Sequence, residues 1–450
     1  MVSWNLPTTL PSEGETLEVA RKVIEEGWKR GVKTEVFVTS LVSLTISSSR
    51  EELTLNKNSK WTLGIRVNGS GLAYTNDPRK ALDSLEVAIK SYKVLGERPL
   101  AETKPIVDRV SQKLKVPPWD VELERKVRDV KEMVKLAKGS VIAAYREVYG
   151  YKLYSSSEGS EIIQRLSYSI HSSMVTLEEG GQRGSGYWSE GSREGYVTDP
   201  VSVVKKAVRK AENQLRGKGI EPGRWEVLLL PPAIGVMVHE ALGHMSEADH
   251  VKAGSPLKKG EKIAPEYVTV IDSPGSGIEW GSIFYDDEGV KPVDVEIVKN
   301  GVVNGFLTDR AYAAELNLPL TGNGRHESPL HRVIPRMRVT YVKPGDWSKD
   351  ELMRELRRGV VIYDTSGGNA ENDGTFFFMS QEAWYVENGE EKYPLKPMGI
   401  AGNVLVMLKE VKAVGKEMDL RPGTCGKWGQ GVPVSVGGGP TLTTLNLSPI

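Results

Sequence analysis

Apolar residues recur every three or four positions in four segments of the first half of the chain, which is the spacing of amphipathic helices. These segments are residues 12–31, 77–92, 119–138 and 199–217. In the first of them, Ser12 is suited to cap the amino end and Gly31 to end the helix. Asp77 and Pro78 mark the start of the second segment in a similar way. The pattern predicts helices that each bury one face.

Between these helices apolar and polar residues alternate, as they do in strands with one solvated face. Residues 33–77 follow this pattern and predict a meander of three or four strands, and residues 140–198 follow it again. The second region ends in the glycine-rich stretch 178–195, which lacks the Lys-Ser/Thr ending of a phosphate loop. We interpret 178–195 as a mobile hairpin tip, with Tyr187 and Trp188 as candidate contacts for a ligand or partner.

The second half of the chain consists mainly of short alternating stretches separated by Gly, Asn and Asp turns. Asn300-Gly301 and Asn388-Gly389 are strong signals for two-residue hairpin turns. We therefore expect a β-rich half with few helices, built as an antiparallel sandwich or an open barrel.

A chain of 450 residues exceeds what one hydrophobic core usually serves, so we expect two domains. The Gly/Pro-rich segment 217–224 is the best candidate for the boundary. This reading gives an α+β protein, with an α/β domain over residues 1–223 and a β-rich domain over residues 224–450.

Composition excludes several classes of function. Lys+Arg and Asp+Glu balance at 59 each, so there is no net field to attract nucleic acid or anionic lipid. No stretch approaches the roughly 20 apolar residues of a membrane helix. The amino terminus lacks the basic start and apolar segment of a secretory signal, and a single cysteine suggests a reducing compartment. We expect a cytoplasmic protein that binds neither nucleic acid nor membrane.

Candidate chemistry is concentrated in residues 232–250, which hold three of the six histidines of the chain. His239 and His244 flank Glu240 there. A catalytic zinc site needs three protein ligands and an open position for water, whose proton a nearby carboxylate can accept. The alternative to a metal site is a structural role, in which both histidines lie on a buried helix and are satisfied by hydrogen bonds. Because two of the six histidines of the chain flank a glutamate here, we favour the metal site.

The spacing of the two histidines is unusual for a metal-binding helix. Residues five apart on a regular helix lie about 140° from each other, so His239 and His244 would not share a face. A π-type turn would bring them together, and so would unwinding of the helix at Gly243. In a third arrangement Glu240 and His244, four apart, face the metal. The sequence thus predicts a local distortion of this helix.

The residues alone do not identify the third protein ligand of the metal. Local candidates are Glu247, Asp249 and His250, and the distant one is Cys425, the only cysteine, in a glycine-rich turn. A lone cysteine is usually a small core residue, but a thiolate is also a good zinc ligand.

The chain resembles the TldD/PmbA family of peptidases, and in particular its metal-bearing TldD branch. The resemblance rests on the His-Glu-x-x-x-His motif at 239–244 and on the Cys-Gly-Lys-x-Gly-Gln motif at 425–430. Between them, residues 286–289, 321–325 and 334–337 follow in the family's order. The match covers most of residues 230–445 and is looser in the first half.

The resemblance implies a zinc-dependent peptidase that hydrolyses short unfolded peptides. His239, His244 and Cys425 would be the zinc ligands, and Glu240 would be the general base on zinc-bound water. It also implies an α/β domain followed by a β-rich domain, and a dimer either with a metal-free sibling of the TldE/PmbA type or with a second copy.

Several further roles are expectations only. Arg325, His326, Lys427 and His331 are candidates for stabilising an oxyanion, whereas Asp286 and Asp287 are better suited to capping a β-turn. Exposed strand edges would suit capture of an extended peptide. The alternative functions are a metal-dependent amidase and a non-catalytic peptide-binding subunit of a heterodimer.

Overall fold

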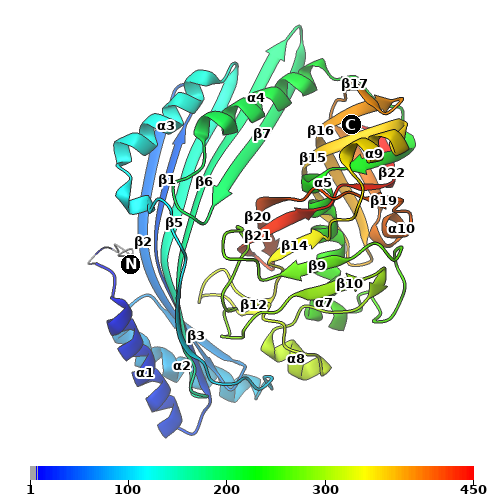
Figure 1. Cartoon of the computed structure of the whole chain (residues 1–450). Helices are drawn as coiled ribbons and strands as arrows, with labels where there is room; N and C mark the ends of the chain where they lie inside the picture. The colour runs from blue at the N-terminus through cyan, green and yellow to red at the C-terminus, as the bar shows by residue number, and fades with distance from the viewer. Residues whose placement is uncertain (1–6, 8) are drawn as a thin grey trace.

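The computed structural model describes residue 7 and residues 9–450, and it places two structural units side by side (Figure 1). The first unit is a long twisted sheet with helices on one face, and the second is β-rich and more compact. This confirms the predicted α+β class. Residue 223, the proposed domain boundary, is the first residue of strand β8 (Gly223–Leu229).

The first unit contains four long helices and seven strands in the described part of the chain. The helices are α1 (Glu13–Lys29), α2 (Ala81–Leu95), α3 (Leu123–Leu136) and α4 (Pro200–Arg216). The strands are β1 (Thr34–Ser48), β2 (Leu53–Val67), β3 (Gly71–Thr75), β4 (Val107–Ser111), β5 (Ser140–Ser156), β6 (Glu161–Glu179) and β7 (Gln182–Ser192). All four predicted helices are confirmed, and Ser12 caps α1 through a reciprocal capping box with Glu15.

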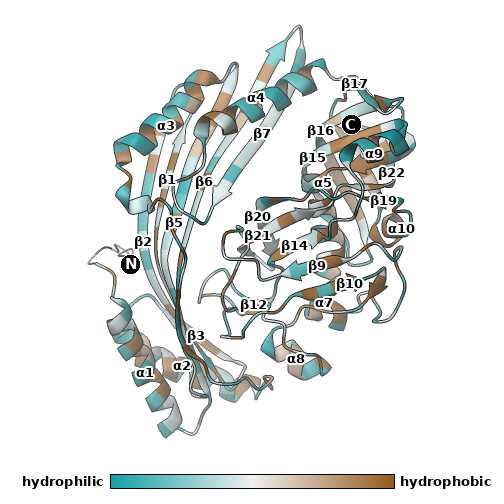
Figure 2. Ribbon diagram, viewed as in Figure 1, coloured by the Kyte–Doolittle hydropathy of each residue, from teal (hydrophilic) through white to brown (hydrophobic). Residues whose placement is uncertain are grey.

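The sheet of this unit has the strand order β3-β2-β1-β5-β6-β4, with β7 also paired to β6. All its pairs are antiparallel except that of β4 with β6. Two hydrophobic clusters lie under the helices, one beneath α1 and α2 and the other beneath α3 and α4. Hydrophilic and hydrophobic colours alternate along α3 and α4, as expected of amphipathic helices (Figure 2).

The interpretation of residues 178–195 as a mobile tip is wrong for most of that stretch. Only Gly180 and Gly181 form the turn, both at positive φ, and the residues that follow form strand β7. A Cβ at Gly184 or Gly186 would lie about 2 Å from backbone oxygens of α4. These glycines therefore permit close packing of a helix on a strand rather than mobility.

The second unit carries its strands in two main sheets. Its longer strands are β15 (Arg358–Ala370), β16 (Thr375–Glu387), β20 (Asp419–Lys427), β21 (Gln430–Gly438) and β22 (Thr441–Pro449). Its shorter strands are β9 (Val270–Ser273), β10 (Val295–Lys299), β11 (Val302–Val303), β12 (Gly324–Arg325), β13 (Ile334–Pro335), β14 (Val339–Val342), β17 (Glu390–Pro394), β18 (Met398–Asn403) and β19 (Ala413–Val414). Helices α8 (Arg310–Leu316), α9 (Lys349–Leu356) and α10 (Val404–Lys409) lie between them in sequence.

One of these sheets is a closed barrel. Strands β8, β22, β18, β16 and β15 pair in a ring, because β15 pairs with β16 on one side and with β8 on the other. The expected β-rich character is confirmed, but neither an open barrel nor a simple sandwich describes it. The second sheet has the order β11-β10-β9-β14-β21-β20. The two predicted Asn-Gly hairpins are present, with Asn300, Gly301, Asn388 and Gly389 all at positive φ.

A short helix, α5 (Pro231–Met237), runs between the barrel and the second sheet and contacts both β15 and β21. Its apolar residues belong to the largest hydrophobic cluster of the unit. The segment that continues from it therefore has a rigid support on two sides. No helix in the described residues is long and apolar enough to cross a membrane.

Candidate metal centre

The predicted distortion is a π-helical turn. Helix α5 continues into a π-helical segment, η3 (Val238–Gly243), followed by α6 (His244–Ser246) and α7 (Ala248–Lys252). The backbone N–H of His244 donates to the carbonyl of His239, five residues earlier, as a π-turn requires. The two imidazole rings consequently lie on one side, with their centroids 5.4 Å apart.

Gly243 does not unwind the helix, because its φ of −58° and ψ of −51° are ordinary helical values. Its role is steric. A Cβ at this position would lie 2.0 Å from the sulfur of Met337, which is itself fully buried. Glycine thus lets the π-turn pack directly against the segment that precedes β14.

Cys425 reaches the helix from the β20–β21 hairpin. Trp428 and Gly429, both at positive φ, form the tight turn of this hairpin. Arg336, a fully buried arginine, donates a 2.6 Å hydrogen bond to the carbonyl of Cys425 and so fixes the strand there. The sulfur of Cys425 lies 3.3 Å from Nε2 of His244.

The donor atoms of His239, His244 and Cys425 all lie within 4.8 Å of one another. His239 is 2% exposed, and neither of its ring nitrogens has a hydrogen-bond partner among the described residues. Buried polar atoms are normally satisfied, so a missing partner calls for an explanation. Two imidazoles and a thiol are the donor set that zinc prefers, and this cluster therefore fits a zinc ion.

A second group, His244, Glu247 and His250, also lies within 4.8 Å. Two of its members, Glu247 and His250, already have hydrogen-bond partners. Glu247 contacts Nδ1 of His244 at 2.7 Å, and Nδ1 of His250 lies 3.0 Å from Oδ1 of Asn372 in the turn between β15 and β16. These contacts favour Cys425 over the local residues as the third ligand.

Glu240 follows His239 on the π-turn, and its side chain is 37% exposed. One of its carboxylate oxygens lies 3.8 Å from Nε2 of His244, the ring nitrogen that faces Cys425. Glu240 is therefore next to the cluster and open to solvent, where a proton acceptor for water would have to be.

A buried chain of charges holds His244 in position. Glu247, which contacts His244, also accepts a 2.8 Å hydrogen bond from Nζ of Lys427. Lys427 donates in addition to Asp249 at 2.7 Å and to the carbonyl of Pro335 at 3.1 Å. Burial would raise the pKa of Glu247, but His244 and Lys427 hold it well below its ordinary value. A carboxylate on the outer nitrogen of a metal-binding histidine fixes its ring and its tautomer.

The electrostatics of the cluster favour a thiolate. Burial raises the pKa of the Cys425 thiol, but the neighbouring imidazoles of His239 and His244 outweigh it and lower the pKa well below its usual value. Burial conversely lowers the pKa of His244, and Glu247 together with Cys425 raises it well above its usual value. The thiolate is the form of cysteine that binds metals.

The four candidates for stabilising an oxyanion have contacts elsewhere. Lys427 uses all three of its donors in the buried chain described above. Arg325 donates to the carbonyls of Met337 and Pro433, His326 packs beside Asp287, and His331 contacts Ser328. Asp286 accepts from the backbone N–H groups of a turn, as predicted. Asp287 pairs instead with Lys152.

Comparison with known proteins finds related domains and chains. Residues 222–445 match the C-terminal domain of PmbA/TldA metallopeptidases, and residues 116–215 match the central domain. A metalloprotease of Methanocaldococcus jannaschii is 36% identical over 363 residues, which cover 78% of this chain and 79% of that protein. A zinc metalloprotease TldD homolog of Saccharolobus solfataricus is 38% identical over 302 residues, or 66% and 68% of the two chains.

Among solved structures, TldE from Thermococcus kodakarensis is similar with a TM-score of 0.78. The alignment covers 96% of this chain and all of that one, at 20% sequence identity. The TM-score establishes a common fold, and at this low identity the chemistry has to be argued from the residues of the site.

Proposed function

Because this chain belongs to the TldD/PmbA family of metallopeptidases, we propose that it is a zinc-dependent peptidase of the TldD branch. His239, His244 and Cys425 would hold the metal. The observation that carries this proposal is the convergence of these three side chains, from two distant segments, beside the exposed carboxylate of Glu240.

A zinc ion held there would supply a Lewis acid that activates water and polarises a carbonyl oxygen. The chain's own residues prepare the site for it. The lowered pKa of Cys425 favours the thiolate form of its sulfur, and Glu247 contacts Nδ1 of His244, whose Nε2 faces that sulfur.

Glu240 is the proposed general base. Its carboxylate accepts a proton from the attacking water and then passes that proton to the nitrogen of the leaving amine. Its exposure allows water and substrate to reach it, whereas His239 and Cys425 are buried behind it.

We propose short, unfolded peptides as substrates. Within the described chain β20 is paired only with β21 and forms the outer edge of its sheet, and it carries Cys425. An extended peptide that adds to this edge through main-chain hydrogen bonds would pass next to the metal centre. Binding of this kind depends on an extended backbone more than on particular side chains, so folded proteins would be poor substrates.

For the assembly, we propose a dimer with a metal-free sibling of the TldE/PmbA type or with a second copy of the chain. The similarity to the fold of a TldE protein supports the first arrangement. A cytoplasmic location is also a proposal, which the single cysteine supports.

The test is Glu240→Gln, assayed on an unfolded protein such as denatured casein and on small capped amides. We expect hydrolysis of the unfolded chain to fall by about 10²–10⁴-fold while the zinc content stays unchanged. Glu266→Gln, a change at an exposed glutamate elsewhere, is the matched control and should leave the rate unchanged. Wild-type cleavage of capped amides alone would point to an amidase. A wild type that holds no zinc and cleaves neither substrate would point to a peptide-binding subunit.

A further inference from the structure

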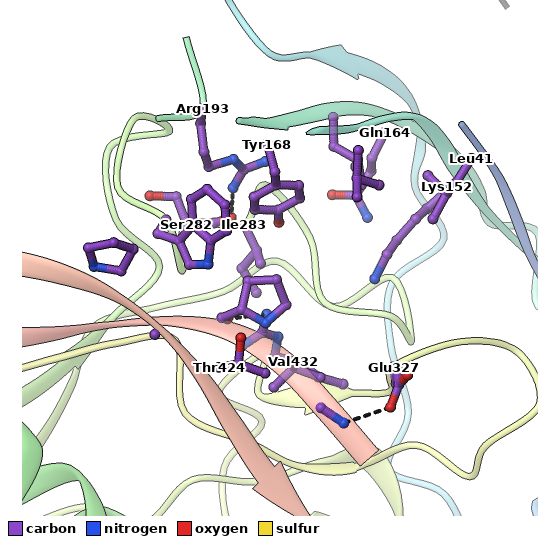
Figure 3. Close-up of a pocket in the computed structure, with 18 of the residues that line it drawn as sticks. Leu41, Lys152, Gln164, Tyr168, Arg193, Ser282, Ile283, Glu327, Thr424 and Val432 are labelled. Atoms are coloured by element: carbon purple, nitrogen blue, oxygen red, sulfur yellow. Dashed lines mark hydrogen bonds between the residues drawn. The ribbon is translucent and has the colours of Figure 1, made fainter. Parts of the chain in front are cut away.

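A well-formed cavity lies between the two structural units, on the other face of the hairpin that carries Cys425 (Figure 3). It has a volume of about 510 Å³, which is in the range of small-molecule sites. Its walls come from β5, β6 and β7, from residues 280–287 and from the β20–β21 hairpin. Thr424 lines the cavity, whereas the side chain of Cys425, the next residue on the strand, points to the metal centre.

Two buried arginines line this cavity without a carboxylate partner among the described residues. Arg193 is 3% exposed and Arg325 is 4% exposed. Arg193 donates to the carbonyl of Ser282 and stacks on Tyr168, with its guanidinium carbon 4.7 Å from the ring centroid. Its Nε is buried and has no partner in the described chain. Figure 3 shows Arg193, Tyr168 and Ser282 grouped at one end of the cavity.

The other charges of the lining are mostly neutralised. Lys152 pairs with Asp287 at 2.8 Å, and Arg165 pairs with Glu13 at 2.6 Å. Burial, with the adjacent Glu288, raises the pKa of Asp286 well above its ordinary value, which favours its neutral form. Glu327 accepts a hydrogen bond from the N–H of Gly431 and lies away from Arg193 in Figure 3. Arg146 also lines the cavity, as an exposed cation. The end of the cavity that holds Arg193 therefore has unbalanced positive charge.

We propose that this cavity binds a carboxylate carried by an apolar or aromatic body, with Arg193 as its main contact. A buried charge is costly unless an opposite charge or full hydrogen bonding compensates it, and a guanidinium with a free N–H matches a carboxylate. The rings of Tyr168, Trp280 and Tyr285 line the same cavity and would pack against the body of the ligand. The carboxylate is either that of a free small molecule or the C-terminal carboxylate of a peptide.

Binding of 3-phenylpropanoate to the purified full chain, measured by calorimetry beside the neutral 3-phenylpropan-1-ol, tests this proposal. We expect the acid to bind at least about tenfold more tightly than the alcohol. Arg193→Gln should abolish this difference, and Arg193→Lys should retain part of it. Arg216→Gln, at an exposed arginine of α4, should leave it unchanged. Equal binding of acid and alcohol, or an acid preference that survives Arg193→Gln, would overturn the proposal.

The acid–alcohol comparison needs no variant, so it remains decisive even if Arg193→Gln does not fold. A second arm separates the two sources of carboxylate. If the ligand is a peptide terminus, Arg193→Gln should raise KM for a free-acid peptide to that of its C-terminally amidated form, with kcat unchanged. If the ligand is a free molecule, the two peptides should share one KM in both proteins. The binding measurement does not depend on catalysis, so its outcome is separate from that of Glu240→Gln.

Discussion

The sulfur of Cys425 lies 3.3 Å from Nε2 of His244, although 181 positions separate the two residues in the sequence. The contact joins a hairpin near the carboxyl end of the chain to a helix in its middle. It exists because the π-turn rotates His244 to the side of His239, and because the buried Arg336 fixes β20 at Cys425 through a hydrogen bond to its carbonyl. The proposed metal centre is therefore a product of tertiary structure that no single segment contains.

Glu247→Gln tests whether the buried chain of charges positions His244. The change removes the charge that faces His244 and Lys427 and leaves the amide to make weaker contacts. We expect zinc affinity to fall by about 10–100-fold, as is typical when the carboxylate partner of a metal-binding histidine is lost. Competition with a chelator measures it, and Glu266→Gln is the control. Unchanged affinity would show that Glu247 has no positioning role.

Gly243→Ala tests the close packing of the π-turn. The added methyl would have to share space with the sulfur of Met337, 2.0 Å from the Cβ position. Overpacking of this kind typically costs about 1–3 kcal/mol of unfolding free energy. Gly219→Ala, where a Cβ meets nothing within 4 Å, should change stability by less than about 0.5 kcal/mol. Urea unfolding of both variants checks the prediction, and equal midpoints would contradict it.

The pH dependence of stability should include a contribution from His171. Burial lowers the pKa of His171 to about 4, and nearby carboxylates offset only part of that shift. Between pH 6.5 and 4 the unfolded chain binds a proton that the folded chain does not, so stability is complete above pH 6.5 and is lost as the pH falls. We expect a loss of about 2 kcal/mol between pH 8 and 5 from this residue.

His171→Gln removes the titrating group and should reduce the difference between the unfolding free energies at pH 8 and pH 5 by that amount. Urea unfolding of wild type and variant at both values measures it. Parallel behaviour of the two proteins would show that His171 titrates alike in the folded and unfolded states.

Local features of the fold follow well from the sequence. The four amphipathic helices, the cap at Ser12 and the two Asn-Gly turns all depend on interactions within a few residues, and periodicity reports such interactions directly. The sequence also shows that a five-residue spacing of the two histidines does not suit a regular helix. The π-turn was therefore one of the three arrangements predicted for this segment.

Predictions failed where distant segments decide the outcome. Trp28 fits the apolar periodicity of residues 12–31 but is 74% exposed, because at this end of α1 the adjacent Gly27 is the residue buried against Thr34 of β1. The barrel closes through the pairing of β15 with both β8 and β16, which no local pattern signals.

Within the site, the periodicity of the sequence does not indicate which side chain is the third ligand beside the two histidines. In the sequence, only the motifs at 239–244 and 425–430, taken together, favour Cys425. The buried chain through Glu247 and Lys427 was also missed, although each follows a proposed ligand, His244 or Cys425, within three positions. Its residue types alone give no sign that they meet.

The most direct test of the central claim is elemental analysis of purified wild type beside Cys425→Ser, with a peptidase assay of both. We expect about one zinc per chain in the wild type, and a loss of both zinc and activity in the variant while its far-UV circular dichroism stays unchanged. Full zinc content and full peptidase activity in Cys425→Ser would contradict a metal centre built from His239, His244 and Cys425.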